Sequence, residues 1–172
     1  MMRVYIPATL AMLQQLVAEG ALRPVNGTAF AVTPRLREAY AEGDEDELAE
    51  VALREAALAS LRLVATAADA SQSTESELPP RRAVLAAEAG DVTLRPDLDD
   101  AVVRLGGPIA IDDVIAAFVD NAAAEAAVTA AIAVVDAADL GDEDAELLVG
   151  DAQDHDLAWY ATQELPFLLD LL

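Results

Sequence analysis

Carboxylates crowd residues 136–156, and this stretch is the best candidate in the sequence for a site that does chemistry. Hard cations such as Mg²⁺ and Ca²⁺ need several oxygen ligands that converge on one point. A calcium-binding loop that started at Asp142 would need glycine at its sixth position, where the chain has Leu147. We therefore expect no metal ion. A site that did bind one would use Asp142, Asp144 and Glu146.

The only histidine of the chain, His155, lies in the same stretch, four residues after Asp151. On a helix this spacing would place the two side chains on one face, as in an acid–base pair. His155, Asp151 and Asp144 are thus the candidate catalytic residues. Catalysis would also need a nucleophile or a substrate within hydrogen-bond reach, and the chain has no G-x-S-x-G motif. A carboxylate-based enzyme using residues 136–156, with or without Mg²⁺, is an alternative to a non-enzymatic protein.

Aromatic residues near the carboxyl end are the candidate interface. Trp159 and Tyr160 are adjacent, and on a strand they would point to opposite faces. One would then lie in the core and the other on the surface, where large aromatic side chains anchor protein interfaces. Phe167 follows in a second apolar run, and Glu164 is the only charged residue between 157 and 169. These residues make a homodimer a candidate.

No cofactor is expected. A nucleotide-binding turn after the first strand would need glycines that let a phosphate approach the backbone, and the chain has Pro7-Ala8-Thr9 there. The chain has no cysteine, which excludes disulfides, thiolate zinc sites and cysteine nucleophiles.

Charge restricts the partners of the chain. It carries 32 acidic residues against ten basic ones, all of them arginine, for a net charge of −22. Such a surface repels nucleic acid and anionic membranes, so we expect neither as a partner. A DNA mimic that competes for DNA-binding proteins is a second alternative. The combination of abundant alanine with arginine as the only base is typical of a GC-rich genome.

The periodicity predicts strands at 3–6, 29–32, 83–87, 92–94, 101–105, 114–119 and 157–162. Between them we expect helices that begin at Thr9, at Thr33-Pro34, at Asp44, at an Asp120-Asn121 cap and at Asp142, with a last helical turn from Pro166. This order predicts an α+β fold with a mixed sheet of about five or six strands and helices packed on it, a two-layer α/β sandwich.

We expect residues 1–172 to form a single domain with a mobile loop near 70–80, because 71–80 is polar, rich in serine and ends in Pro-Pro. No stretch is apolar enough over about 20 residues to span a bilayer, and the amino end lacks the layout of a secretory signal. A cytoplasmic location is expected.

Four segments together carry a resemblance: RVYIPATL at 3–10, AFAVTP at 29–34, LGDEDAE at 140–146 and HDLAWY at 155–160. The chain resembles a family of small acidic actinobacterial proteins that is defined only as a domain of unknown function. The resemblance implies no activity and no catalytic residues. We therefore expect a non-enzymatic cytoplasmic protein that acts through contacts with a protein partner of unknown identity.

Overall fold

The structure is a computed structural model that describes residues 1–40, 42–70 and 78–172. The main sheet contains β1 (Met2–Ala8), β3 (Thr28–Phe30), β4 (Ala83–Ala89), β5 (Val92–Leu94), β6 (Val102–Leu105), β8 (Val114–Val119) and β9 (Ala158–Ala161). A small second sheet pairs β2 (Ala21–Leu22) with β7 (Ile109–Ala110). The helices are α1 (Leu10–Glu19), α2 (Pro34–Ala39), α3 (Glu45–Ala70), α4 (Glu125–Ile132), α5 (Val135–Asp139), α6 (Glu143–Gln153) and α7 (Leu165–Asp170).

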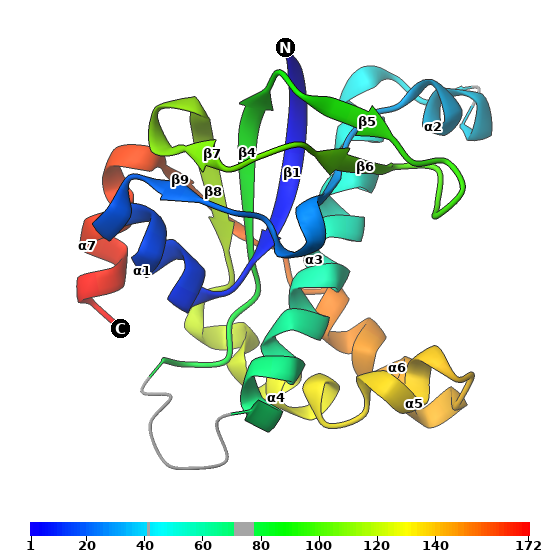
Figure 1. Cartoon of the computed structure of the whole chain (residues 1–172). Coiled ribbons are helices and arrows are strands. Elements are labelled where there is room, and N and C mark those ends of the chain that lie inside the picture. The colour runs from blue at the N-terminus through cyan, green and yellow to red at the C-terminus, as the bar shows by residue number, and fades with distance from the viewer. Residues whose placement is uncertain (41, 71–77) are drawn as a thin grey trace.

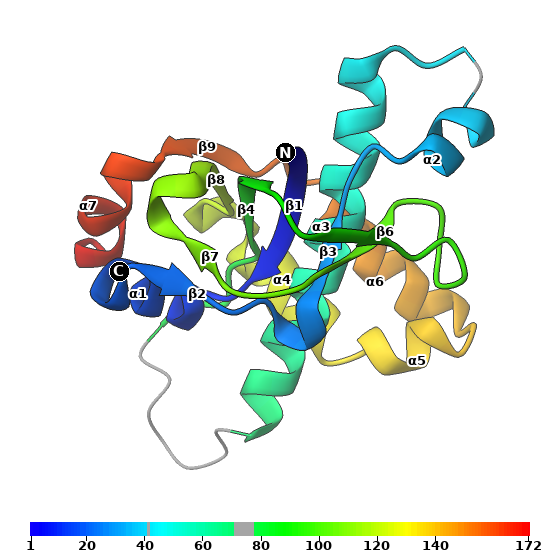
Figure 2. The same ribbon diagram turned by 45° about the horizontal axis from the view of Figure 1, so that its top comes forward.

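The main sheet has the order β5-β6-β3-β1-β4-β8-β9, and every pair of neighbouring strands is antiparallel. The expected α+β class is confirmed. The sheet has seven strands, one at each of the seven segments predicted, rather than the five or six expected for the sheet, and it is not mixed. Helices cover both of its faces, so the two-layer description was wrong: α1 and α7 lie on one side and α3 on the other (Figures 1 and 2).

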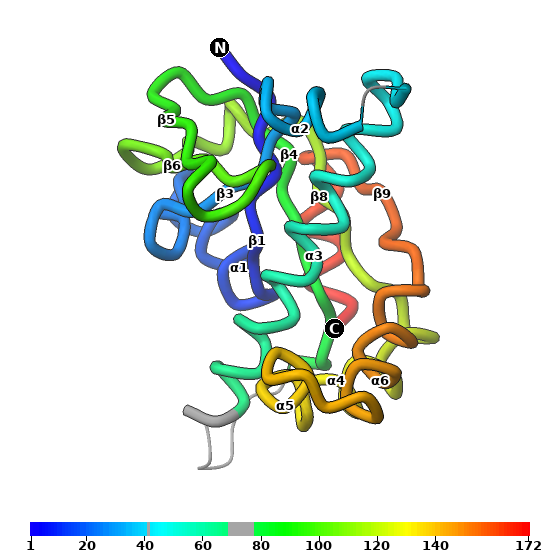
Figure 3. Tube along the Cα trace, turned by 90° about the vertical axis from the view of Figure 1, so that its right-hand side faces the viewer, coloured from blue at the N-terminus to red at the C-terminus, as the bar shows by residue number. Residues whose placement is uncertain are grey.

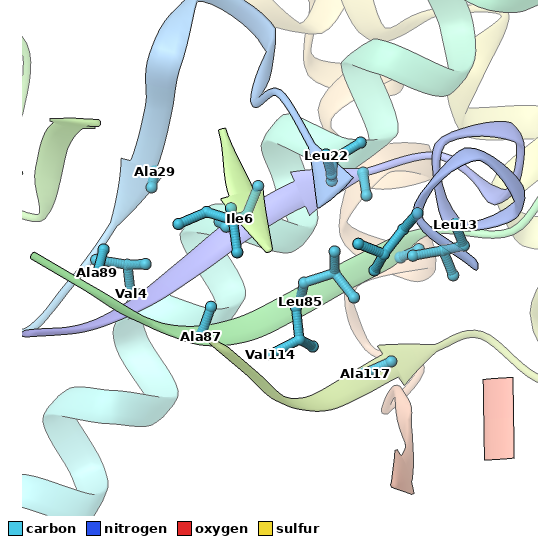
Figure 4. Packing of buried hydrophobic residues seen from close by; sticks show 14 of the residues in the cluster. Val4, Ile6, Leu13, Leu22, Ala29, Leu85, Ala87, Ala89, Val114 and Ala117 are labelled. Carbon is cyan, nitrogen blue, oxygen red and sulfur yellow. The ribbon is translucent and has the colours of Figure 1, made fainter. Parts of the chain in front are cut away.

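Successive side chains of the central strands point to opposite faces of the sheet, so each face has its own apolar core. Val4, Ile6 and Ala8 of β1 point toward α1 and α7, and Leu85 and Ala87 of β4 join them there (Figure 4). The residues between them point the other way. Because the side-chain period of a strand is two, the run from Val4 to Ala8 in β1 can serve two cores at once.

The opposite core lies under α3. Tyr5, Val84 and Ala86 of the sheet meet Ala52 and Ala56 of the helix. Besides Leu48, the buried residues of α3 in this core are alanines, which lets the helix approach the strands closely.

Ser60 fixes the position of α3 on the sheet. Its buried hydroxyl donates to the Ala8 carbonyl oxygen at 2.7 Å and accepts from the Ala83 N–H at 2.9 Å. One hydroxyl thus satisfies a backbone acceptor where β1 ends and a backbone donor where β4 begins, inside the core.

A third apolar cluster joins the second half of α3 to α4, α5 and α6, with Leu61, Val128 and Val135 at its centre. The sequence predicted one alanine helix through Val135, capped by Asp120-Asn121. In the structure a 3-10 turn (Ala122–Ala124) precedes α4, whose start has no side-chain cap, and the helix stops before α5. The capping role predicted for Asp120 was wrong because its carboxylate is buried against Arg82.

Most of the predicted helix ends are confirmed. Thr9, Thr33, Asp44 and Asp142 each accept a hydrogen bond from a backbone N–H in the first turn of the helix that follows. Gly20 ends α1 with a φ of 78°, a left-handed conformation that glycine adopts without a steric penalty.

Part of the expected loop near 70–80 lies outside the described residues, since residues 71–77 are not described. Across the rest of the chain, no helix combines the length and the apolar character needed to cross a membrane.

Candidate functional site

A cleft of about 270 Å³ lies between α3 and residues 153–157, the segment that leads from α6 into β9. We call it the α3 cleft. It is lined by the carboxylates of Glu47, Glu50 and Asp156, by Arg54, Arg82 and His155, by Gln153, and by the apolar side chains of Val51, Leu53, Ala57 and Leu157. Glu47, Glu50, Arg54 and Ala57 recur at intervals of three and four residues, which places them on one face of α3.

Arg82 holds this side of the cleft together. Its side chain is 1% exposed, and that of its partner Asp120 is fully buried. The guanidinium donates from Nε to Asp120 Oδ2 at 2.9 Å and from Nη2 to Asp120 Oδ1 at 2.7 Å, and the Arg82 N–H also donates to Oδ2. A bidentate pair of this kind fixes both side chains in one orientation.

The same guanidinium reaches the segment beyond α6. Nη1 donates to Gln153 Oε1 and Nη2 to the His155 carbonyl oxygen, both at 2.8 Å. Gln153 in turn donates to the backbone oxygen of Arg54 at 3.2 Å. The start of β4, the end of α6 and the middle of α3 are therefore connected through one buried cation.

His155 lines the α3 cleft, but its expected pairing with Asp151 on one helix face was wrong. The helix ends at Gln153, and the His155 N–H closes a turn on the Ala152 carbonyl oxygen. Asp151 and Asp144 are exposed on α6 and do not line the cleft. Of the three candidate catalytic residues, only His155 lines the α3 cleft.

The carboxylates of 136–156 have individual roles rather than a common centre. Asp142 caps α6, accepting from the Ala145 N–H at 2.9 Å. Asp139 pairs with Arg62 of α3 at 2.8 Å, and this hydrogen-bonded partner lowers the pKa of the Asp139 carboxyl. Among the described residues, no group of three or more histidine or acidic side chains is arranged to hold a metal ion, and Asp142, Asp144 and Glu146 are all exposed.

The lining of the α3 cleft can bind charged groups. Its carboxylates can accept hydrogen bonds from a cation, and its guanidinium groups can donate to an oxygen acceptor. It contains no serine, threonine, tyrosine or cysteine, so any acid–base or nucleophilic group in it is His155 or a carboxylate.

The candidate interface residues lie at one margin of the sheet, where β9 is the terminal strand. We call residues 157–163 the β9 edge. Trp159, opposite Phe118 of β8, is on the face that carries α3 and is 59% exposed. Figure 3 looks onto this face, with β8 and β9 to the side of α3.

Tyr160 and Phe167 lie on the other side of the same margin. Tyr160 packs against the core under α1 and α7, and Phe167 is 72% exposed on α7. The expectation that one member of the Trp159-Tyr160 pair is core and the other surface is met. Trp159 and Phe167, however, flank the β9 edge from opposite faces and do not form one cluster.

Sequence reasoning missed the two residues that organise the cleft. The sequence alone indicates no role for Arg82 and only that of a helix cap for Asp120. A usable signal was the position of both at strand ends, Arg82 just before β4 and Asp120 just after β8, because these strands are antiparallel neighbours with Ala83 opposite Val119.

Comparison with known proteins agrees with the resemblance noted from the sequence. A family model described as a family of unknown function (DUF6912) matches residues 2–169. The searches of curated proteins and of solved structures returned no match. Since the matched region covers nearly all of the 172 residues, the chain belongs to this family of unknown function, DUF6912.

Proposed function

We propose that this protein is not an enzyme and acts through protein–protein contacts, and that the β9 edge binds the same edge of a second copy of the chain. The observation that carries the proposal is that β9 ends the main sheet while Trp159 beside it is 59% exposed. An edge strand presents unpaired N–H and C=O groups that can pair with a strand of another chain.

The two edges of the sheet differ in their protection. At the other margin, β5 is preceded by Asp91 and followed by Arg95-Pro96, and charged residues and proline are the usual means of blocking an edge. At β9 the uncharged, proline-free strip is longer, 157–163 against 92–94, with Asp156 and Glu164 at its two ends. This contrast favours β9 over β5 as the interface.

The net negative charge of the chain restricts how two copies can associate. A chain with a net charge of −22 repels its own copy, so an interface must keep carboxylates apart. Antiparallel pairing of two β9 strands about a two-fold axis brings the uncharged strip against itself. Trp159 would then pack on one face of the joint and Phe167 on the other.

The proposal includes a cytoplasmic location. It also includes an actinobacterial source, which the alanine-rich composition with arginine as the only base supports. Fractionation of a host that expresses the protein from its own gene would test the location.

Cysteine cross-linking tests the position of the interface, because the chain has no cysteine of its own. Single cysteines are introduced in turn at Ala158, Ala161 and Thr162, with Val92→Cys and Leu94→Cys on β5 as the matched controls. A disulfide requires the two Cα atoms within about 7 Å, so only positions near the two-fold axis will link. We expect covalent dimers from at least one β9 variant and none from β5.

Two results would refute the proposal: no cross-linking from any β9 position at concentrations where the protein is dimeric, or cross-linking from β5 with equal or greater yield.

A further inference from the structure

Arg82, which lines the α3 cleft, has one buried N–H that donates to no acceptor among the described residues. A guanidinium has five N–H groups. Four of those of Arg82 donate to Asp120 (twice), Gln153 and His155, and the second N–H of Nη1 has no acceptor among the described residues. Nε and Nη2 face Asp120, whereas Nη1 faces Gln153, a residue of the cleft lining. Arg82 itself lines the cleft.

A side chain that is 1% exposed rarely leaves a donor without an acceptor. Here the donor has a cavity of about 270 Å³ beside it. An oxygen acceptor of a ligand, such as a carboxylate, would complete the hydrogen bonding of Arg82. Arg54 lines the same cavity, forms no ion pair with a described residue, and would add a second cation near that oxygen.

The carboxylates of the cleft indicate which chemical group the other end of the ligand carries. Glu47, Glu50 and Asp156 line the cleft, and none of the three forms an ion pair with a described residue. Even Glu50 and Arg54, which have the helical spacing of an ion pair, do not form one. Since the charge of Arg82 is matched by Asp120, the cleft has three carboxylates against Arg54 and favours a cationic group.

We propose that the α3 cleft binds a free α-amino acid with a cationic side chain, of the arginine or lysine type. The ligand carboxylate accepts from Arg82 Nη1 and is attracted by Arg54. The side-chain cation lies against Glu47, Glu50 and Asp156, and its methylene groups pack on Val51 and Leu157. The site does not depend on self-association at the β9 edge.

Calorimetric titration of the full chain with four probes tests both ends of the ligand. The probes are L-arginine, agmatine, which lacks the carboxylate, L-citrulline, which lacks the side-chain charge, and N-acetyl-L-arginine amide, which imitates an arginine inside a peptide. We expect L-arginine to bind tightest and each of the other three to bind up to about fivefold more weakly, the size of one partly exposed ion pair.

Matched variants separate the cleft from the general field of an acidic protein. Glu50→Gln should weaken L-arginine binding about fivefold, whereas Glu146→Gln, which removes the same charge from an exposed residue outside the cleft, should leave it unchanged. Arg54→Gln should weaken L-arginine but not agmatine, with Arg23→Gln, an exposed arginine outside the cleft, as its control.

Failure has distinct forms. The site is refuted if L-arginine gives no binding heat, or if Glu50→Gln and Glu146→Gln weaken it equally. Tighter binding of N-acetyl-L-arginine amide than of L-arginine would refute a free amino acid and assign the cleft to a basic residue of a partner chain. These outcomes are independent of the proposed dimer, because the β9 edge is tested by the oligomeric state and not by ligand binding.

Discussion

At the scale of single residues, Arg82 and Asp120 are the groups on which the candidate site depends. Folding buries both side chains away from water. Such a pair contributes little net stability compared with apolar residues, but removing one partner leaves an uncompensated charge in the core. The pair positions other groups, because Arg82 also donates hydrogen bonds to Gln153 and to the His155 carbonyl oxygen.

We predict that Asp120→Asn lowers the free energy of unfolding by about 3–5 kcal/mol, because Arg82 would remain buried without its counter-charge. Asp139→Asn is the matched control: it breaks an ion pair between half-exposed side chains, so its cost should stay below about 1 kcal/mol. Urea denaturation measures both. Equal losses in the two variants would contradict the role given to the buried pair.

Glu55 provides a pH-dependent prediction. Burial raises the pKa of the Glu55 carboxyl above its ordinary value, and the Asp99 carboxylate raises it further. A carboxyl with a raised pKa in the folded state destabilises the protein when it is ionised, and this penalty disappears as the pH falls through the folded pKa toward the unfolded one. Glu55→Gln should therefore stabilise the protein at pH 7, by less than about 1 kcal/mol because solvent screens the partly buried charge.

Thermal melting of Glu55→Gln and the wild type at neutral pH and near pH 4 checks this sign. The advantage of the variant should be present at neutral pH and absent at the lower one. A variant that is less stable than the wild type at neutral pH would show that Glu55 stabilises the folded state through Arg54 or Arg62.

At the scale of elements, local chemistry made most of the structure predictable. Thr9 before Leu10, and Thr33 before Pro34, specify helix starts whatever the rest of the chain does, because a cap depends on residues within one turn. The helix start at Asp142 was predicted for the same reason. The face that α6 buries was not, because Leu147 and Leu148 are exposed whereas Ala145 and Ala152 are buried.

What could not be predicted depends on contacts between distant parts of the chain. The two-residue strands β2 and β7 exist only because each pairs with the other across 86 intervening positions, between Leu22 and Ile109. Arg82 and Asp120 likewise acquire their roles from the pairing of β4 with β8. Neither the β2–β7 pairing nor the Arg82–Asp120 pair produces a hydrophobic period or a capping signal in a single sequence.

The amino end of α3 gives a prediction at this scale. Asp44 Oδ1 accepts from the Glu47 N–H at 2.8 Å and so satisfies one of the free donors of the first turn. Asp44→Ala should lower the free energy of unfolding by about 0.5–2 kcal/mol. Asp46→Ala, which removes an acid of the same turn that is not the cap, should cost clearly less in the same denaturation experiment. A larger loss from Asp46→Ala would contradict the cap assignment.

At the scale of the whole molecule, excess negative charge opposes every association between copies. Charges on separate molecules interact over about 8–10 Å at physiological ionic strength, so added salt screens most of this repulsion. An interface made of uncharged strand and aromatic side chains loses nothing to that screening. Self-association through the β9 edge should therefore strengthen as NaCl is added, unlike association that depends on ion pairs.

Light scattering over a range of protein concentrations, at low and at moderate NaCl, tests the central claim most directly. The mass of the wild type should approach about 36 kDa, twice the 18.0 kDa of one chain. When salt is added, it should reach this mass at lower protein concentrations. Trp159→Ala should remain near the monomer mass, while Leu140→Ala, which truncates an exposed leucine outside the β9 edge, should behave as the wild type. A wild type that stays monomeric under all conditions, or a Trp159→Ala variant that dimerises equally well, would contradict the account.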